Sequence, residues 1–217
     1  LMSLGGRGGT ACVKPLMPLA RSGQGALRVI GIHALACAGG PDALAALKAA
    51  IDDKDETVQD EAVRTLSAWP NRWPKDDAVA EPLLALAKSG KKAAHRVLAL
   101  RGFLQYLQGA KQLKDDDRLA KVREVLPLVT RREEKRLMIS VLGNIRLAGA
   151  LEALVTCAAD PAVTEEACSG IVNLAGKGDL KGASKDDRRK ALELAAEKSK
   201  SRSVKQRANA ALKAINR

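Results

Sequence analysis

The sequence predicts an all-α protein, and two observations carry that prediction. The first is a row of apolar or small residues spaced four apart, Val58, Ala62 and Leu66, which falls on one face of a helix of 3.6 residues per turn. The second is the composition. The 217 residues include only one Tyr, one Phe and two Trp, and no β-branched alternating run extends beyond a few residues. This composition suits close helix packing and suits strands poorly.

The same row recurs along the chain. Further rows of three lie at Leu27/Gly31/Leu35, Ala94/Leu98/Gly102, Glu134/Met138/Leu142, Val163/Ala167/Ile171 and Val204/Ala208/Leu212. Successive rows are about 30 to 40 residues apart, and each step contains a second apolar helix. These second helices are predicted at Leu44/Leu47/Ile51, Leu83/Leu86, Leu119/Val122/Leu126, Leu151/Leu154 and Leu192/Ala195.

A period of this length holding two helices is typical of an α-solenoid, in which a repeat buries its apolar face only against its neighbours. Residues 39–66, GGPDALAALKAAIDDKDETVQDEAVRTL, resemble the turn, second helix, acidic turn and next first helix of HEAT repeats. The resemblance covers roughly residues 11–217. It implies a right-handed α-solenoid of about five to six stacked antiparallel helix pairs.

We expect the Gly-rich residues 1–10 to be a disordered or truncated lead-in, and residues 11–217 to form a single repeat domain. Because the chain starts with Leu in what reads as the end of an earlier repeat, we expect a fragment of a longer protein. No apolar run approaches the roughly 18 to 20 residues of a transmembrane helix. The start also lacks the apolar core of a signal peptide. The localisation therefore stays open, with a cytoplasmic one slightly favoured.

Several polar residues are assigned to helix caps rather than to chemistry. Asp55, Asp160 and Ser201 each lie three residues before the first member of a row, where a side-chain oxygen accepts the first free amides of a helix. Ser184 and Asp187 have the spacing of a capping box. The cysteines lack a C-x-x-C spacing and are interpreted as small buried thiols. They are Cys12, Cys37, Cys157 and Cys168.

Groups able to carry catalysis are sparse. The two histidines, His33 and His95, lie in different repeats, and neither shares a spacing with a Cys, a Ser or a second His. The motifs of zinc proteases, dinucleotide-binding folds, P-loops and nucleophile elbows are all missing. We therefore expect no enzyme activity, no cofactor and no metal site. His33 is interpreted as a packed, hydrogen-bonded residue, and His95 as a residue that could meet an acid across the groove.

The segment WPNRWPKDD, residues 69–77, departs from the usual short turn. Because each Trp precedes a Pro, which disfavours the helical region, we expect both rings to lie on an extended connection. Exposed in this way, Trp69 and Trp73 are candidate contacts for a partner. The alternative is that both rings fold back over the end of a helix pair.

The net charge of +12 is unevenly spread: residues 91–146 hold 14 basic and 6 acidic side chains, whereas residues 41–90 hold 6 and 10. The cations gather at the starts of two predicted first helices. The candidate binding residues are Lys91, Lys92, Arg96, Arg131, Arg132 and Lys135. Because equivalent positions line up in stacked repeats, they could form a basic stripe that binds a polyanion. The alternative is the solvated surface of a basic protein.

These patterns favour a non-catalytic scaffold that binds a protein partner, with a groove lined by the second helices. The resemblance to HEAT repeats implies that this role is accessory to an activity carried elsewhere. A solenoid that binds nucleic acid through the basic stripe is the second hypothesis. The third is a HEAT-like DNA glycosylase or lyase, since the glycosylases of this fold use aromatic residues and a carboxylate in a basic groove. The aromatic residues available here are Trp69, Trp73, Phe103 and Tyr106. The oligomeric state is not indicated.

Overall fold

The computed structural model describes residues 9–178 and 180–215, which form twelve α-helices and three short 3-10 helices without a β-strand. The all-α prediction is therefore confirmed. Most of the predicted lead-in, residues 1–8, lies outside the described residues, and helical structure begins at Gly9 with η1 (Gly9–Cys12). Leu147 and Lys181 form an isolated bridge between loops. Among these described helices, none is long and apolar enough to cross a membrane.

The chain divides into two compact units, Leu1–Ala110 and Lys111–Arg217. Unit 1 contains η1, α2 (Val13–Ala20), α3 (Gly25–Ala38), α4 (Pro41–Ala50), α5 (Glu56–Arg72), η2 (Asp77–Val79), α6 (Ala80–Ser89) and α7 (Ala93–Gly109). Unit 2 contains α8 (Asp115–Val125), η3 (Leu126–Leu128), α9 (Arg132–Leu142), α10 (Ala148–Cys157), α11 (Thr164–Ala175), α12 (Lys185–Lys198) and α13 (Arg202–Ile215). That residues 11–217 act as one domain stays a prediction.

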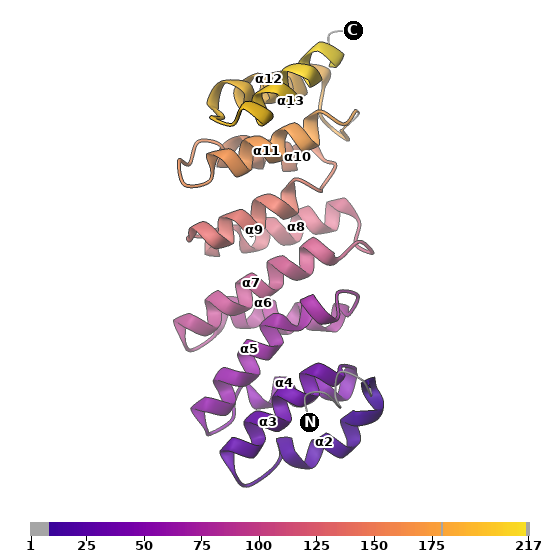
Figure 1. Cartoon of the computed structure of the whole chain (residues 1–217), viewed down its shortest axis with the longest axis vertical. Helices are drawn as coiled ribbons and strands as arrows, with labels where there is room; N and C mark the ends of the chain where they lie inside the picture. The colour runs from indigo at the N-terminus through magenta and orange to yellow at the C-terminus, as the bar shows by residue number, and fades with distance from the viewer. Residues whose placement is uncertain (1–8, 179, 216–217) are drawn as a thin grey trace. The chain divides into compact units, whose positions relative to one another are not determined.

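Within unit 1, the first helices pack on one another in chain order. α5 lies between α3 and α7, while α4 contacts α3 and α5, and α6 contacts α7 (Figure 1). α2 packs on α3 and touches α4. Every helix in this unit therefore buries one side against its neighbours in sequence.

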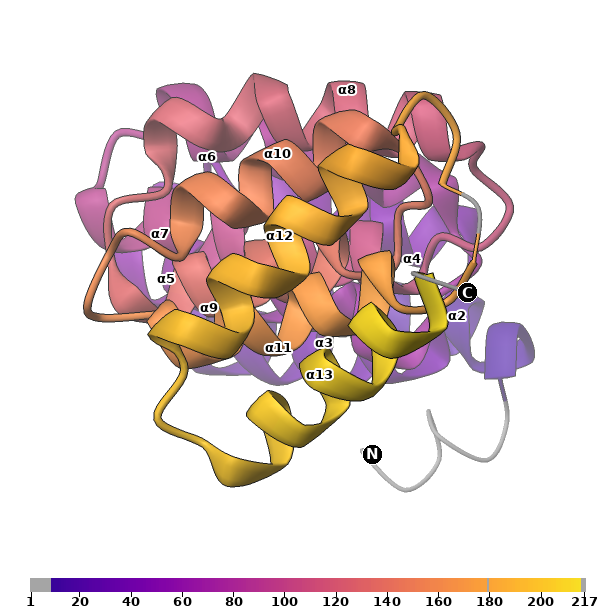
Figure 2. The ribbon, with the colours of Figure 1, turned by 90° about the horizontal axis from the view of Figure 1, so that it is seen from above.

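Unit 2 repeats this arrangement. α11 contacts α9 and α13 on its own side and α10 and α12 on the other. In the view of Figure 2, α8, α10 and α12 lie on one side of this unit, and α9, α11 and α13 lie on the other. First and second helices thus form two layers, with the apolar core between them.

The predicted rows explain most of this core. Val58, Ala62 and Leu66 are fully buried in α5, as are the rows of α9 and α11. Glu134, the polar first member of the α9 row, is buried too, and its carboxylate accepts the backbone N–H of Arg131 at 3.1 Å. A charged residue is tolerated there because it caps the helix start.

The row predicted for α7 is wrong at its first member and right at its last. Ala94 is exposed and Leu98 is half-buried, whereas Gly102 is buried, as are His95, Ala99 and Phe103. Gly102 faces α5, because a Cβ placed there would lie 2.5 Å from the backbone oxygen of Ser67 in α5. The two backbones approach closely at this glycine, and that contact sets which face of α7 turns inward.

The extended connection predicted for residues 69–77 is also wrong. α5 continues to Arg72 with Pro70 inside its last turns. The Trp69 ring is 1% exposed, and its Nε1 donates to Asp76 Oδ2 at 2.9 Å. A residue before proline only prefers the extended region, and burial of a large aromatic side chain outweighs that preference here.

Most of the predicted caps are confirmed. Asp55 Oδ1 accepts the Thr57 N–H at 3.0 Å at the start of α5, and Ser184 forms a capping box with Asp187 before α12. Ser201 Oγ accepts the N–H of Val204 at 3.4 Å. Asp160 caps earlier than predicted, since its Oδ1 accepts from Ala162 in the turn that precedes α11. The four cysteines are free thiols, of which Cys37 and Cys168 are buried and Cys12 and Cys157 partly so.

Candidate functional site

The predicted binding cations of unit 1 lie at the start of α7, and most of them contact protein groups. Lys92 Nζ donates to Asp60 Oδ1 at 2.8 Å and lies 3.7 Å from Glu56. Arg96 donates to the backbone oxygen of Gly90 at 2.7 Å, which closes the end of the preceding helix. Lys91 is 89% exposed and lies 3.6 Å from an exposed aspartate, so this ion pair is weak.

Asp60 also binds His95. Nε2 of the buried imidazole lies 2.7 Å from the same Oδ1 that accepts Lys92. Hydrogen bonds from Lys92, and then from His95, lower the pKa of Asp60, and the bond to Asp60 raises the pKa of Lys92. His95 therefore meets an acid, as expected, but this acid lies on the neighbouring first helix α5 rather than across the groove, and the contact joins α7 to α5.

His33 is held in a similar way on the other side of α5. Its Nδ1 lies 2.7 Å from Glu61 Oε1, and Arg64 binds the same carboxylate at 2.6 Å. The interpretation as a packed, hydrogen-bonded histidine is confirmed. Both histidines thus link first helices of unit 1, and each contacts a carboxylate rather than a nucleophile.

In unit 2, the predicted cations lie at the start of α9. Lys135 Nζ donates to Asp160 Oδ2 at 2.6 Å, a bond that lowers the pKa of Asp160. The neighbouring Arg136 donates to Glu166 at 2.5 Å. Arg131 and Arg132 are exposed and have no acidic partner within hydrogen-bonding distance in the described residues.

Charges of opposite sign therefore alternate between successive first helices. In unit 1, the acidic start of α5 lies between Arg28, which is 3.1 Å from Asp53, and Lys92. In unit 2, the acidic start of α11 binds Arg136 of α9 through Glu166, whereas before α13 Glu165 accepts from the Ser199 hydroxyl and from the Lys200 backbone N–H. An uninterrupted basic stripe is absent from each unit over its described residues. The cations of α7 and α9 belong to different units.

The two tryptophans occupy different environments. Trp69 is buried, so its ring offers no surface to a partner. Trp73 is partly exposed, packs against Gly39, and donates from Nε1 to the backbone oxygen of Ala36 at 3.1 Å. Both rings fold back onto the helices, as the alternative interpretation held. Trp73 still borders an open apolar pocket of about 700 Å³ that also includes Pro41, Pro74 and Asp76.

In the Trp73 pocket a partly exposed aromatic ring and an acid lie together, as a base-excision site would need. Asp76, however, already accepts from Trp69 Nε1 and from the N–H of Ala78. Phe103 and Tyr106 are buried, and Tyr106 donates to Asp77 at 2.8 Å. In the residues that the structure describes, no three His, Cys, Asp or Glu side chains gather as a metal site.

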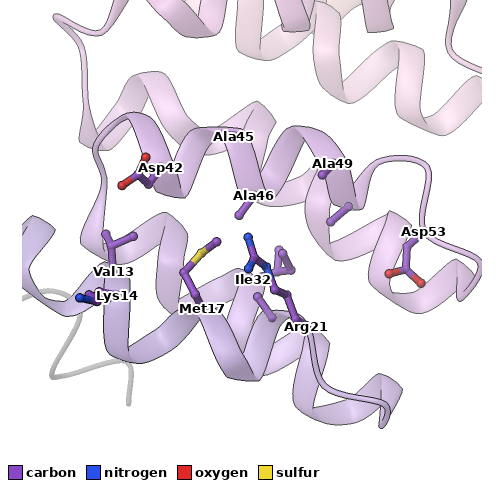
Figure 3. A pocket seen from close by; sticks show the side chains of 12 residues that line it. Val13, Lys14, Met17, Arg21, Ile32, Asp42, Ala45, Ala46, Ala49 and Asp53 are labelled. Atoms are coloured by element: carbon purple, nitrogen blue, oxygen red, sulfur yellow. The ribbon is translucent and has the colours of Figure 1, made fainter.

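A groove that the sequence analysis missed lies between α2 and α4. We call it the α2–α4 groove; its volume is about 580 Å³. In Figure 3, α2 contributes Lys14, Met17 and Arg21, and α4 contributes Asp42 and a row of alanines. The alanines are Ala45, Ala46, Ala49 and Ala50. Their short side chains leave the space between the helices open.

The cations of this groove differ from those of α7. In the described structure, neither the Lys14 ammonium nor the Arg21 guanidinium has a protein partner, and both side chains are exposed. Lys14 lies towards one end and Arg21 reaches from the end of α2 towards α4, with Met17 between them (Figure 3). The spacing of these residues, three and then four apart, was the sequence signal for this face.

A second groove, of about 590 Å³, lies beside α6 and the start of α7. It contains Lys91, Lys92 and His95 together with Asp52 and Glu56. The predicted cations therefore face a groove, but one in which acids and bases are mixed and largely paired.

Comparison with known proteins gives a fold and no family. No protein-family profile matches the chain, and no curated protein matches it. Among solved structures, the chain is similar to the crystal structure of an engineered protein, with a TM-score of 0.54 and 21% sequence identity. The match covers 94% of this chain and 96% of the engineered one. At this identity the likeness concerns the all-helical fold alone.

Proposed function

We propose that this chain is a non-catalytic scaffold built from HEAT-like repeats, which binds a protein segment in the groove lined by its second helices. The packing of α3, α5 and α7 in chain order supports the repeat interpretation for unit 1, and that of α9, α11 and α13 supports it for unit 2. A right-handed solenoid over residues 11–217 is part of the proposal.

The observation that carries the proposal is the α2–α4 groove. It is open, its floor is formed by Met17 and small side chains, and its free charges lie at the rim. Interfaces combine an apolar centre with a polar rim, and small side chains let a partner backbone approach closely. The histidines and three of the six predicted cations, Lys92, Arg96 and Lys135, are used instead to join elements within each unit.

A selection experiment tests the scaffold function without assuming a partner. A displayed library of random peptides is panned against the immobilised full chain, and the selected peptides are mapped by hydrogen exchange. We expect micromolar binders that protect α2, α4 or α6. Failure to select any binder, or protection confined to the outer faces of the first helices, would contradict the scaffold.

Nucleic-acid binding remains the second candidate, because Arg131 and Arg132 are exposed and no acid lies within hydrogen-bonding distance of either in the part of the chain that the structure describes. Nonspecific binding gains its affinity from many phosphate contacts. The partners found for Lys92 and Lys135 reduce the number of such contacts that the predicted cations can make. A glycosylase or lyase is the weakest candidate, since Asp76 beside Trp73 is already engaged by two donors.

A further inference from the structure

The α2–α4 groove carries a specific charge pattern on one helix face. Lys14 and Met17 of α2, together with Arg21, which directly follows the last residue of this helix, lie at positions i, i+3 and i+7, and all three line the groove. Seven residues of helix place the two cations about 10 Å apart, with the thioether between them. Along this face, a positive charge is followed by an apolar side chain and then by a second positive charge.

Lys14 and Arg21 differ from the nearby Arg28 in that Arg28 has acidic partners. Arg28 is satisfied by Asp53 at 3.1 Å, by Asp55 at 3.7 Å and by the Ser22 carbonyl at 2.9 Å. Lys14 and Arg21 have no such acids in the described structure, although each lines a groove with an apolar floor. Charges in this position are available to a partner.

The facing wall restricts what can enter. Ala45, Ala46 and Ala49 present only methyl groups, so a helix can lie against α4 at close range. Asp53 is neutralised by Arg28, which leaves Asp42 as the unpaired acid of this wall, in the first turn of α4. A partner residue beside Asp42 would therefore be neutral or basic, while those beside α2 would be acidic.

We propose that the α2–α4 groove binds an amphipathic helix of a protein partner, with two acidic residues seven apart that pair with Lys14 and Arg21 and an apolar residue between them that contacts Met17. A helix fits because the groove runs between two helices and its cations repeat at a helical spacing. Charge complementarity sets the direction and register of the partner. This inference rests on the scaffold function proposed above and names the chemistry of its partner.

The test uses the full chain and designed peptides of about 18 residues, a length that makes five turns of helix. The acidic peptide is rich in Ala, with Glu at i and i+7 and Leu at i+3 and i+4. The reversed peptide has Lys in place of both Glu residues, and a third peptide has a Pro in its centre. Binding is followed by fluorescence anisotropy with the wild type and with the double variant Lys14→Glu/Arg21→Glu.

We expect the acidic peptide to bind the wild type at least about tenfold more tightly than the reversed peptide, and the double variant to invert this preference. The inversion separates charge pairing from unfolding, because a misfolded variant would lose both peptides. The matched control Lys75→Glu changes an exposed cation of the same unit outside the groove and should leave both affinities unchanged. Ala46→Trp, which fills the groove without changing its charge, should abolish binding.

Equal binding of the acidic and reversed peptides to the wild type would overturn the proposal. So would a double variant that keeps the circular dichroism spectrum and melting temperature of the wild type but loses the acidic peptide without gaining the reversed one. Equal binding of the Pro-containing peptide would overturn the helical mode. The two proposals can be refuted separately. If peptides selected from the library bind the double variant as tightly as the wild type, only the role of the α2–α4 groove is refuted. If the library yields no binder, both the groove and the scaffold function are refuted.

Discussion

Nε2 of His95 lies 2.7 Å from Oδ1 of Asp60, and this contact joins α7 to α5. The same oxygen accepts Lys92 Nζ at 2.8 Å, so one exposed carboxylate serves a buried imidazole and an ammonium. The cations at the start of α7 would by themselves oppose the helix macrodipole, and the carboxylate of the neighbouring helix offsets that cost. Their first role is therefore structural.

Replacing Asp60 tests this role. Asp60→Asn keeps the size of the side chain but removes the charge that binds Lys92 and His95. We expect the melting temperature to fall by about 2 to 4 °C, because a charge-assisted bond to a buried group is lost. Glu56→Gln is the control, since its carboxylate lies 3.7 Å from Lys92, and it should change the melting temperature by less than about 1 °C. Equal effects of the two changes would contradict the role given to Asp60.

Acid should destabilise the protein through the same carboxylates. The hydrogen bonds from Lys92 and Lys135 hold the pKa of Asp60 and of Asp160 below the ordinary value of 3.8. The unfolded chain therefore takes up protons first, so this stabilisation is complete above about pH 5 and is lost as the pH falls through the lower folded values. Urea unfolding at pH 6, 4 and 3 should show a falling midpoint. Asp60→Asn should lose less than the wild type, and a midpoint independent of pH would contradict the linkage.

Gly102 should not accept a methyl group. Gly102→Ala places a Cβ 2.5 Å from the Ser67 backbone oxygen, so α7 must move away from α5. We expect a loss of about 1 to 3 kcal/mol in the free energy of unfolding. Gly109→Ala, in the last turn of the same helix, meets Pro74 at an ordinary 3.5 Å and should be neutral or slightly stabilising. Chemical denaturation measures the free energy of unfolding of both variants. A loss in Gly102→Ala alone indicates the steric contact, whereas an equal loss in both variants would indicate a general effect of replacing glycine.

The two tryptophans should differ in solvent access. In Trp73→Phe the remaining fluorophore is Trp69, which is 1% exposed, so its emission should resist quenching by acrylamide. In Trp69→Phe the remaining Trp73 is partly exposed and should be quenched several-fold more strongly. Similar quenching constants in the two folded variants would contradict the burial of Trp69.

The sequence predicted the helices well because burial follows their period. Val58, Ala62 and Leu66 are fully buried as their spacing requires, and the same holds for the row that begins at Val163. The row of α7 failed at Ala94 because spacing alone does not measure how closely two backbones approach, and the close approach at Gly102 turns His95 inward. The extended position expected for Trp69 is wrong because burial of the ring outweighs the preference of a residue before proline, as the alternative of rings folded back on the helices held.

The candidate site was harder to predict. The cations of α7 and α9 were found from their clustering, but the acids that bind Lys92 and Lys135 lie 32 and 25 positions away in the sequence. Clustering therefore did not show which of these charges are paired in the fold. Lys14 and Arg21 were passed over because they are isolated in sequence. Lys14 and Arg21 become candidate binding residues only because the short alanine side chains of α4 leave a groove beside them.

Binding of labelled double-stranded DNA, single-stranded DNA and RNA across a salt series tests the central claim, that this chain recognises a protein segment rather than a polyanion. We expect no binding that survives ~150 mM salt, because Lys92 and Lys135 of the predicted basic stripe are already bound to Asp60 and Asp160. Affinity that persists at that salt concentration, has a steep dependence on salt, and is abolished by changing Lys91, Lys92, Arg131 and Arg132 to Glu would contradict the claim.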